Sequence, residues 1–152
     1  YMIREAVQLN KNGPYFSAIG NFAELGYPTF RWQAAWTTTL RTGNWTHSGV
    51  INMRSGYLDQ EVTAEVLDGA GNVTGTEDIR VKVPEHLTFD WQSSWALRKD
   101  MQLTVGAINV FDTKPPLSIS NGGLGRGQQF GFDDRFYDSR GRMFYANFSY
   151  KF

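Results

Sequence analysis

The sequence predicts an all-β fold whose antiparallel strands form a segment of a transmembrane β-barrel. In several segments apolar and polar residues alternate, which is the period of a strand with two different faces. Short turns and long loops alternate between these segments, as they do in membrane barrels. Aromatic residues make up 15% of the chain and glycine occurs 16 times, a composition that favours strands and turns over helices.

The most regular alternation lies in residues 142–152 and predicts the last strand. This segment has the length of about 9–11 residues that a membrane-crossing strand needs. The residues between its apolar positions are mostly polar. On this segment alone, the last strand of a soluble β-sandwich is an equally good interpretation. The apolar face consists of Phe144, Ala146, Phe148, Tyr150 and Phe152.

A first pair of strands is predicted around the turn at Arg41–Asn44, because its Gly-Asn pair suits the left-handed backbone of a hairpin. Alternation over residues 29–40 predicts the first strand of the pair. The return strand is predicted over residues 45–59. Its alternation is weaker, since Val50 falls on the polar face.

Residues 60–86 predict a solvated hairpin that projects from the main sheet. Acidic residues dominate its first part, and Asp68–Asn72 forms a tight turn between two runs that favour strands. These runs are Val62–Leu67 and Ile79–Val83, and Pro84 ends the second one.

A second pair of strands is predicted over residues 87–98 and 101–107, around the charged turn Arg98–Asp100. The remaining residues predict two long loops: residues 113–141, which are rich in glycine, and residues 1–28, which hold a strand remnant at Glu5–Leu9. Five alternating segments are thus joined by short turns and long loops in strict alternation, which favours a membrane barrel over a soluble β fold.

Charge and composition exclude several kinds of site. The chain has 15 basic and 15 acidic residues, so its net charge gives no reason to expect nucleic acid as a partner. It has no cysteine, which excludes a disulfide, a thiolate metal site and a cysteine nucleophile. No apolar run is long enough for a transmembrane helix. Residues 1–4 lead into no apolar signal segment, so we expect either a cytoplasmic chain or a mature or internal piece of a longer protein.

Three motifs follow one another in the last part of the chain. Leu103–Asp112 (LTVGAINVFD) is a strand that ends in Asn-Val-Phe-Asp, and two prolines follow it at 115 and 116. Phe132–Arg142 (FDDRFYDSRGR) is a charged element that precedes the last strand. Phe144–Phe152 is that strand, with an aromatic residue at its end. Together they resemble the C-terminal part of TonB-dependent outer-membrane receptors, whose penultimate strand ends in Asn-Leu-Phe-Asp.

The resemblance departs from the family's pattern at Asp134, where proline is common, and residues 29–86 match it only in rhythm. It implies a barrel of about 22 strands in the bacterial outer membrane, filled by an N-terminal plug and driven by the TonB complex. Five strands cannot close such a barrel, so we expect the chain to be its C-terminal portion, without the plug and the earlier strands. Residues 1–28, 59–86 and 113–141 would then be external loops.

The resemblance also implies partners and a function. The partners are outer-membrane lipid, the TonB complex through the missing N-terminal part, the barrel assembly machinery and a small-molecule ligand. In the family the assembly machinery reads the terminal strand, which assigns Phe148, Tyr150 and Phe152 to the assembly signal. The implied function is active uptake of a scarce ligand, such as an iron chelate (a siderophore complex), a vitamin or an oligosaccharide.

No catalytic residue, cofactor or metal site is predicted, and we expect the protein not to be an enzyme. His47 and His86 fall at opposite ends of their strands and lack the spacing of metal ligands. Arg135 and Arg140 are expected to pair with the acids of the charged element, which leaves no calcium site there. The candidate ligand contacts, with loop packing as the alternative role, are Arg126, Phe130, Phe132, Arg135, Tyr137 and Arg140.

Two other functions remain open. A soluble β-sandwich that serves as a binding or adhesion module would bury the apolar face against a second sheet. It would purify without detergent. An outer-membrane enzyme or a small passive porin would need a complete set of strands in its own gene, so the full open reading frame separates these from a receptor.

Overall fold

The computed structural model describes residues 6–8, 11–22, 27–119 and 131–152, and their regular elements are all β-strands. The strands pair antiparallel within three sheets, which confirms the all-β prediction. In these ranges no helix has the length and apolar character needed to span a membrane. The chain separates into two compact units. Unit 1 contains Tyr1–Trp32, Ser55–Glu85 and Pro115–Tyr137, and unit 2 contains Gln33–Arg54, His86–Lys114 and Asp138–Phe152.

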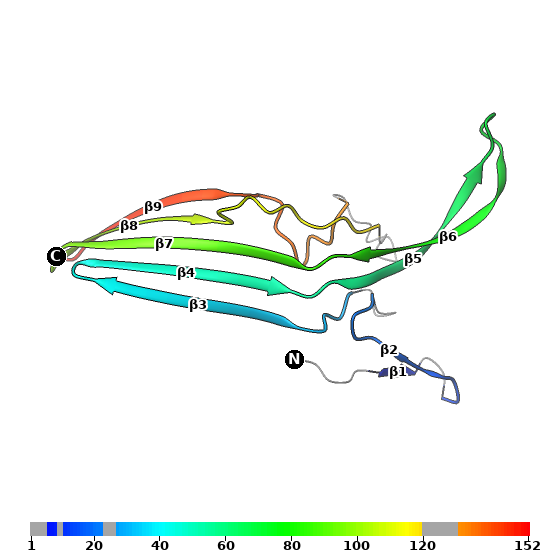
Figure 1. The fold of residues 1–152 in the computed structure, drawn as a ribbon, viewed down its shortest axis with the longest axis horizontal. Helices are drawn as coiled ribbons and strands as arrows, with labels where there is room; N and C mark the ends of the chain where they lie inside the picture. Colours follow the sequence, from blue (N-terminus) through cyan, green and yellow to red (C-terminus); the bar gives the residue numbers. More distant parts are fainter. Residues whose placement is uncertain (1–5, 9–10, 23–26, 120–130) are drawn as a thin grey trace. The chain divides into compact units, whose positions relative to one another are not determined.

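Unit 2 is a 5-stranded antiparallel sheet in the order β3-β4-β7-β8-β9 (Figure 1). These are the strands that the alternating segments predict. Their bounds are β3 (Gln33–Thr42), β4 (Trp45–Arg54), β7 (His86–Arg98), β8 (Met101–Ile108) and β9 (Met143–Tyr150).

Two short turns lie at one end of this sheet, as predicted. Gly43 and Asn44 alone connect β3 to β4, and Gly43 has a φ of 57°, which glycine adopts without strain. Lys99 and Asp100 alone connect β7 to β8. The amide of Lys151, just after β9, donates to the Asp100 carbonyl at the same end. The longer connections of the sheet therefore all join it at the opposite end.

Unit 1 contains two hairpins, one long and one short. β5 (Tyr57–Leu67) pairs with β6 (Val73–Val83), which confirms the hairpin predicted over residues 60–86. The Asp68 carboxylate accepts hydrogen bonds from the amides of Ala70 and Asn72 and so closes its turn. β1 (Ala6–Gln8) pairs with β2 (Tyr15–Ser17), so the predicted strand remnant is half of a hairpin.

In the first pair of strands, one predicted boundary of each strand is wrong, and Ser55 explains both differences. The first strand begins at Gln33 rather than Thr29, and the return strand ends at Arg54 rather than Asp59. The buried Ser55 hydroxyl accepts hydrogen bonds from the amides of Arg31 and Trp32, which therefore take no part in a strand ladder. Beyond Ser55 the extended chain continues as β5, but it pairs with β6 instead of the sheet.

The core of unit 1 is aromatic and gathers residues that are far apart in the sequence. The Phe30 ring meets Tyr57 edge-on at 5.6 Å between ring centroids and Phe136 at 5.2 Å. Its buried members are Phe30, Tyr57, Val83 and Tyr137, with Phe22, Phe132 and Phe136 packed against them. The cluster joins residues of two predicted strands, Phe30 and Tyr57, to Phe132, Phe136 and Tyr137, which lie in a predicted loop.

Candidate functional site

One face of the unit 2 sheet is apolar on all five strands. The register aligns the apolar positions of neighbouring strands: Trp45 lies opposite Trp95, Trp95 opposite Leu103, and Leu103 opposite Phe148. We call this the apolar face. Its exposed large side chains are Trp36, Leu40, Trp45, Leu87, Trp91, Trp95, Val105, Phe144, Phe148 and Tyr150. Within the described residues no second layer covers these side chains, and Trp36 and Phe144 are 66% and 77% exposed.

The tryptophans near the short turns stack into a row on the apolar face. The rings of Trp45 and Trp95 lie 5.1 Å apart and nearly parallel. The His47 ring continues the row, stacked between Trp45 and Trp91. Such stacked pairs contribute about 0.5–1.5 kcal/mol beyond their buried area.

The polar groups of His47 and Ser93 satisfy each other within the apolar face. The two residues lie opposite each other in the β4–β7 register, and His47 Nδ1 is 2.6 Å from the Ser93 hydroxyl oxygen. Ser93 is 3% exposed. The hydrogen bond pairs Nδ1 of the histidine with the buried Ser93 hydroxyl, so neither of these two groups is left unsatisfied on the apolar face.

The opposite face is polar, and its side chains form hydrogen bonds across neighbouring strands. We call this the polar face. Asn52 donates to Asp90 at 3.0 Å, and the Tyr145 hydroxyl donates to the Gln92 side chain at 2.9 Å. Two hydroxyl pairs, Thr39 with Ser48 and Ser94 with Thr104, add bonds of 3.1 and 2.9 Å.

Gly106 makes room for one of these bonds. It lies opposite Tyr145 in the β8–β9 register, and a Cβ at residue 106 would overlap the Tyr145 ring. The ring can therefore cross β8 and place its hydroxyl on Gln92 of β7. One tyrosine thus ties three strands together on the polar face.

The Asn-Val-Phe-Asp motif after β8 forms a local network of hydrogen bonds. Asn109 and Asp112 have φ values of 52° and 54°, a left-handed backbone that short polar residues tolerate best. The Asn109 amide donates to the Asp90 carboxylate at 2.7 Å, and its side chain binds the backbone of Thr113. The Asp112 carboxylate accepts from the amide of Arg142, just before β9. The motif therefore connects the end of β8 to Asp90 within β7 and to the residue before β9.

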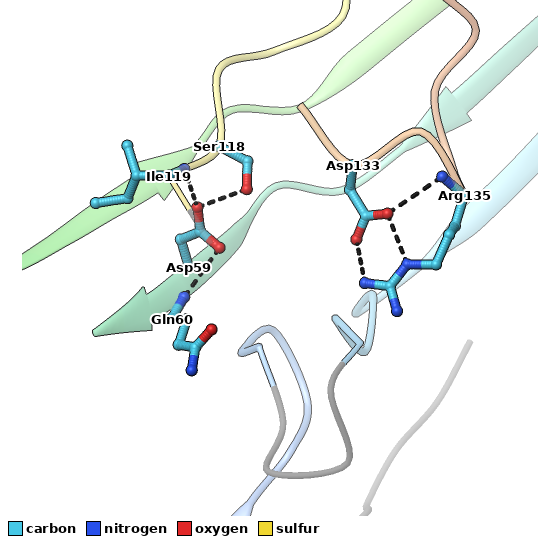
Figure 2. Close-up of polar contacts among 6 residues, drawn as sticks. All are labelled: Asp59, Gln60, Ser118, Ile119, Asp133 and Arg135. Carbon is cyan, nitrogen blue, oxygen red and sulfur yellow. Dashed lines mark hydrogen bonds and ion pairs between the residues drawn. The ribbon is translucent and has the colours of Figure 1, made fainter. Parts of the chain in front are cut away.

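The charged element before β9 pairs its acids with its arginines, as predicted. Asp133 is 1% exposed, and Arg135 holds both of its oxygens at 2.8 and 2.6 Å (Figure 2). The guanidinium of Arg140 binds the Asp138 carboxylate in the same way, and the shortest distance, from Nη2 to Oδ2, is 2.6 Å. These hydrogen bonds lower the pKa of the Asp138 carboxyl.

Asp59 is a second buried carboxylate of unit 1, with no exposed surface. Its side chain accepts hydrogen bonds from the Ser118 hydroxyl at 2.7 Å and from the amides of Ile119 and Gln60 (Figure 2). The bonds join β5 to a segment 59 residues later. The sequence places Asp59 at a strand end, and no local signal indicates this role.

The structure gives the predicted ligand contacts different positions. Arg126 and Phe130 lie outside the described residues. Tyr137 belongs to the buried core and Phe132 packs against it, so both have a packing role. Arg135 and Arg140 remain partly exposed while they bind their acids. In the assigned assembly signal, Phe148, Tyr150 and Phe152 are all exposed, and the last two rings meet edge-on at 5.1 Å.

No group of three or more histidine and acidic side chains able to hold a metal ion occurs among the residues that the structure describes. No family model, curated protein or solved structure matches the chain.

Proposed function

We propose that the chain is part of a TonB-dependent outer-membrane receptor that takes up a scarce ligand, such as an iron chelate, a vitamin or an oligosaccharide. The observation that carries the proposal is the sheet of unit 2, with its exposed apolar face and its cross-bonded polar face. Lipid chains would cover the apolar face, and a wet lumen would solvate the polar face.

The distribution of aromatic residues supports a membrane position. Trp45, Trp95 and Tyr150 lie on the apolar face beside the short turns, where membrane barrels carry a girdle of aromatic residues at the interface. The strands of the sheet are 8 to 13 residues long, close to the span of a bilayer.

The edges of the sheet require further strands. Among the described strands, β3 pairs only with β4, and β9 pairs only with β8. Unpaired backbone groups cannot face acyl chains without a large cost. In this proposal both edges pair with other strands of a closed barrel, and the segments of unit 1 are external loops that capture ligand. Uptake then needs transport and no bond chemistry.

A soluble β-sandwich module is the alternative, in which a second sheet covers the apolar face. The two proposals differ in how the protein purifies. We expect it in the outer-membrane fraction, extracted only by detergent. A monodisperse monomer without detergent, with a sharp cooperative thermal transition, would contradict the membrane proposal.

Uptake itself is tested in cells with and without TonB. Accumulation of ferric citrate, vitamin B12 and maltohexaose represents the three ligand classes. We expect accumulation of one of them to require both this protein and TonB. Accumulation that is equal in the strain without TonB would contradict active uptake and favour a passive pore.

A further inference from the structure

An open groove of about 630 Å³ lies in unit 1, and this volume is typical of small-ligand sites. Four segments line it: residues 20–21, 31–32, 55–58 and 82–85. Backbone hydrogen bonds hold its walls together. The amide of Phe22 donates to the Leu58 carbonyl at 2.7 Å, and the amide of Leu58 donates to the Gly20 carbonyl at 2.8 Å. The amide of Ser55 donates to the Trp32 carbonyl at 3.0 Å. The groove is therefore built by the fold and does not depend on one flexible loop.

Two glycines allow these walls to approach closely. A Cβ at Gly20, whose φ is 75°, would lie 2.5 Å from Nε of Arg31. A Cβ at Gly56 would lie 2.5 Å from the Val83 carbonyl oxygen. Arg31 therefore lies across Gly20, with its guanidinium beside the groove.

The groove carries two cations whose charge is not neutralised by an ion pair. Arg31 and Lys82 both line it and are exposed, and neither forms an ion pair within the described part of the chain. Glu85 is the one carboxylate among the lining residues of the described chain. Two cations against one acid leave a net positive groove, and Trp32 adds an aromatic side chain to its wall.

We propose that this groove binds an oxyanion group, a carboxylate or a phosphate, of the captured ligand. The guanidinium of Arg31 presents a planar fork of donors that matches both groups, and Lys82 adds a second positive charge. The inference deepens the proposed uptake function and rests on it, because it names the chemistry of the ligand. It differs from the contacts expected at residues 126–140.

The test measures binding of citrate and of inorganic phosphate to the detergent-solubilised protein by calorimetry. We expect R31Q to weaken binding of the preferred anion about tenfold, since a hydrogen bond to a charged group is lost. K82Q should weaken it about threefold, and E85Q should strengthen it. R31K should recover part of the loss, because it restores the charge without the fork. Preference for citrate or for phosphate identifies the source of the oxyanion.

K99Q is the matched control, because Lys99 is an exposed cation in the β7–β8 turn of unit 2. Binding equal to wild type in R31Q, or a loss in K99Q as large as in R31Q, would overturn the inference. Absence of binding by both anions, in protein that still inserts into lipid vesicles, would overturn it and leave the proposed function standing. If the protein binds citrate or phosphate but stays soluble without detergent or lipid, the result would support the oxyanion groove and contradict the proposal of an outer-membrane receptor.

Discussion

The side chain of Asn109 makes two hydrogen bonds to the backbone of Thr113, accepting from its amide at 2.9 Å and donating to its carbonyl at 3.0 Å. Asn109 is buried and has a left-handed backbone. N109A should lose both bonds and strain the backbone, with a total cost of about 2–4 kcal/mol in unfolding free energy. N109G should cost less, because glycine removes the strain and only the bonds are lost.

Urea unfolding of the protein refolded in lipid vesicles measures both variants. Equal costs for N109A and N109G would show that the left-handed backbone contributes nothing. If neither variant lowers the unfolding free energy, the two hydrogen bonds from Asn109 to Thr113 do not stabilise the end of β8.

Leu103 and Thr104 are neighbours in β8 that lie on the apolar and the polar face. L103R should destabilise the protein in vesicles by about 2–4 kcal/mol, the cost of arginine near the bilayer midplane. T104R loses one hydroxyl pair with Ser94 and should cost about 1 kcal/mol. The refolding assay in vesicles compares them, and a cost for T104R equal to that of L103R would contradict the assignment of faces.

The alternation of residues predicts the sheet of unit 2 because a strand's faces are a local property. Face assignments for Trp36, Trp91 and Phe148 follow from their own neighbours, and the register bears them out. Pairing is not local. The alternation predicts one strand over residues 45–59, yet the strand partner changes at Ser55: β4 pairs with β7 before it, and β5 pairs with β6 after it.

The interior of unit 1 could not be predicted for the same reason. The contact of Asp59 with Ser118 and the packing of Tyr137 with Phe30 and Tyr57 join the ends of predicted strands to the predicted loop 113–141, which has no period. The groove at Arg31 also depends on such contacts, since Lys82 lies far from it in sequence. The pairing of Arg135 with Asp133 was predictable, because the two side chains are close along the chain.

Tyr57 should make the stability of unit 1 sensitive to alkali. Burial raises the pKa of its phenol above the ordinary value of 10.0, and the Ser118 hydroxyl only partly opposes this effect. The unfolded chain therefore loses the proton first, so stability is complete below about pH 10 and falls as the pH rises beyond it. Y57F should reduce the fall in melting temperature between about pH 9 and pH 11. An identical fall in Y57F would contradict the role of Tyr57.

Asp68 should make the tip of the β5–β6 hairpin sensitive to acid. The Asn72 side chain, with the amides of Asn72 and Ala70, lowers the pKa of its carboxyl below 3.8. The turn is therefore fully stabilised above that value and loses its support as the pH falls through the lower, folded pKa. Amide hydrogen exchange over residues 66–76 should accelerate on acidification relative to D68N. The same pH dependence in both proteins would exclude Asp68 as the cause.

The most direct test of the lipid-facing assignment uses spin labels along β9 in the protein reconstituted in phospholipid vesicles. The chain has no cysteine, so single cysteines at residues 144–149 can each carry one nitroxide. Labels at Phe144, Ala146 and Phe148 should be mobile, accessible to oxygen and shielded from aqueous nickel chelate, because acyl chains surround them. Labels at Tyr145, Asn147 and Ser149 should show less contact with oxygen. Immobile labels at residues 144, 146 and 148 that neither oxygen nor nickel reaches would show a packed protein core instead, and the lipid-facing account would be wrong.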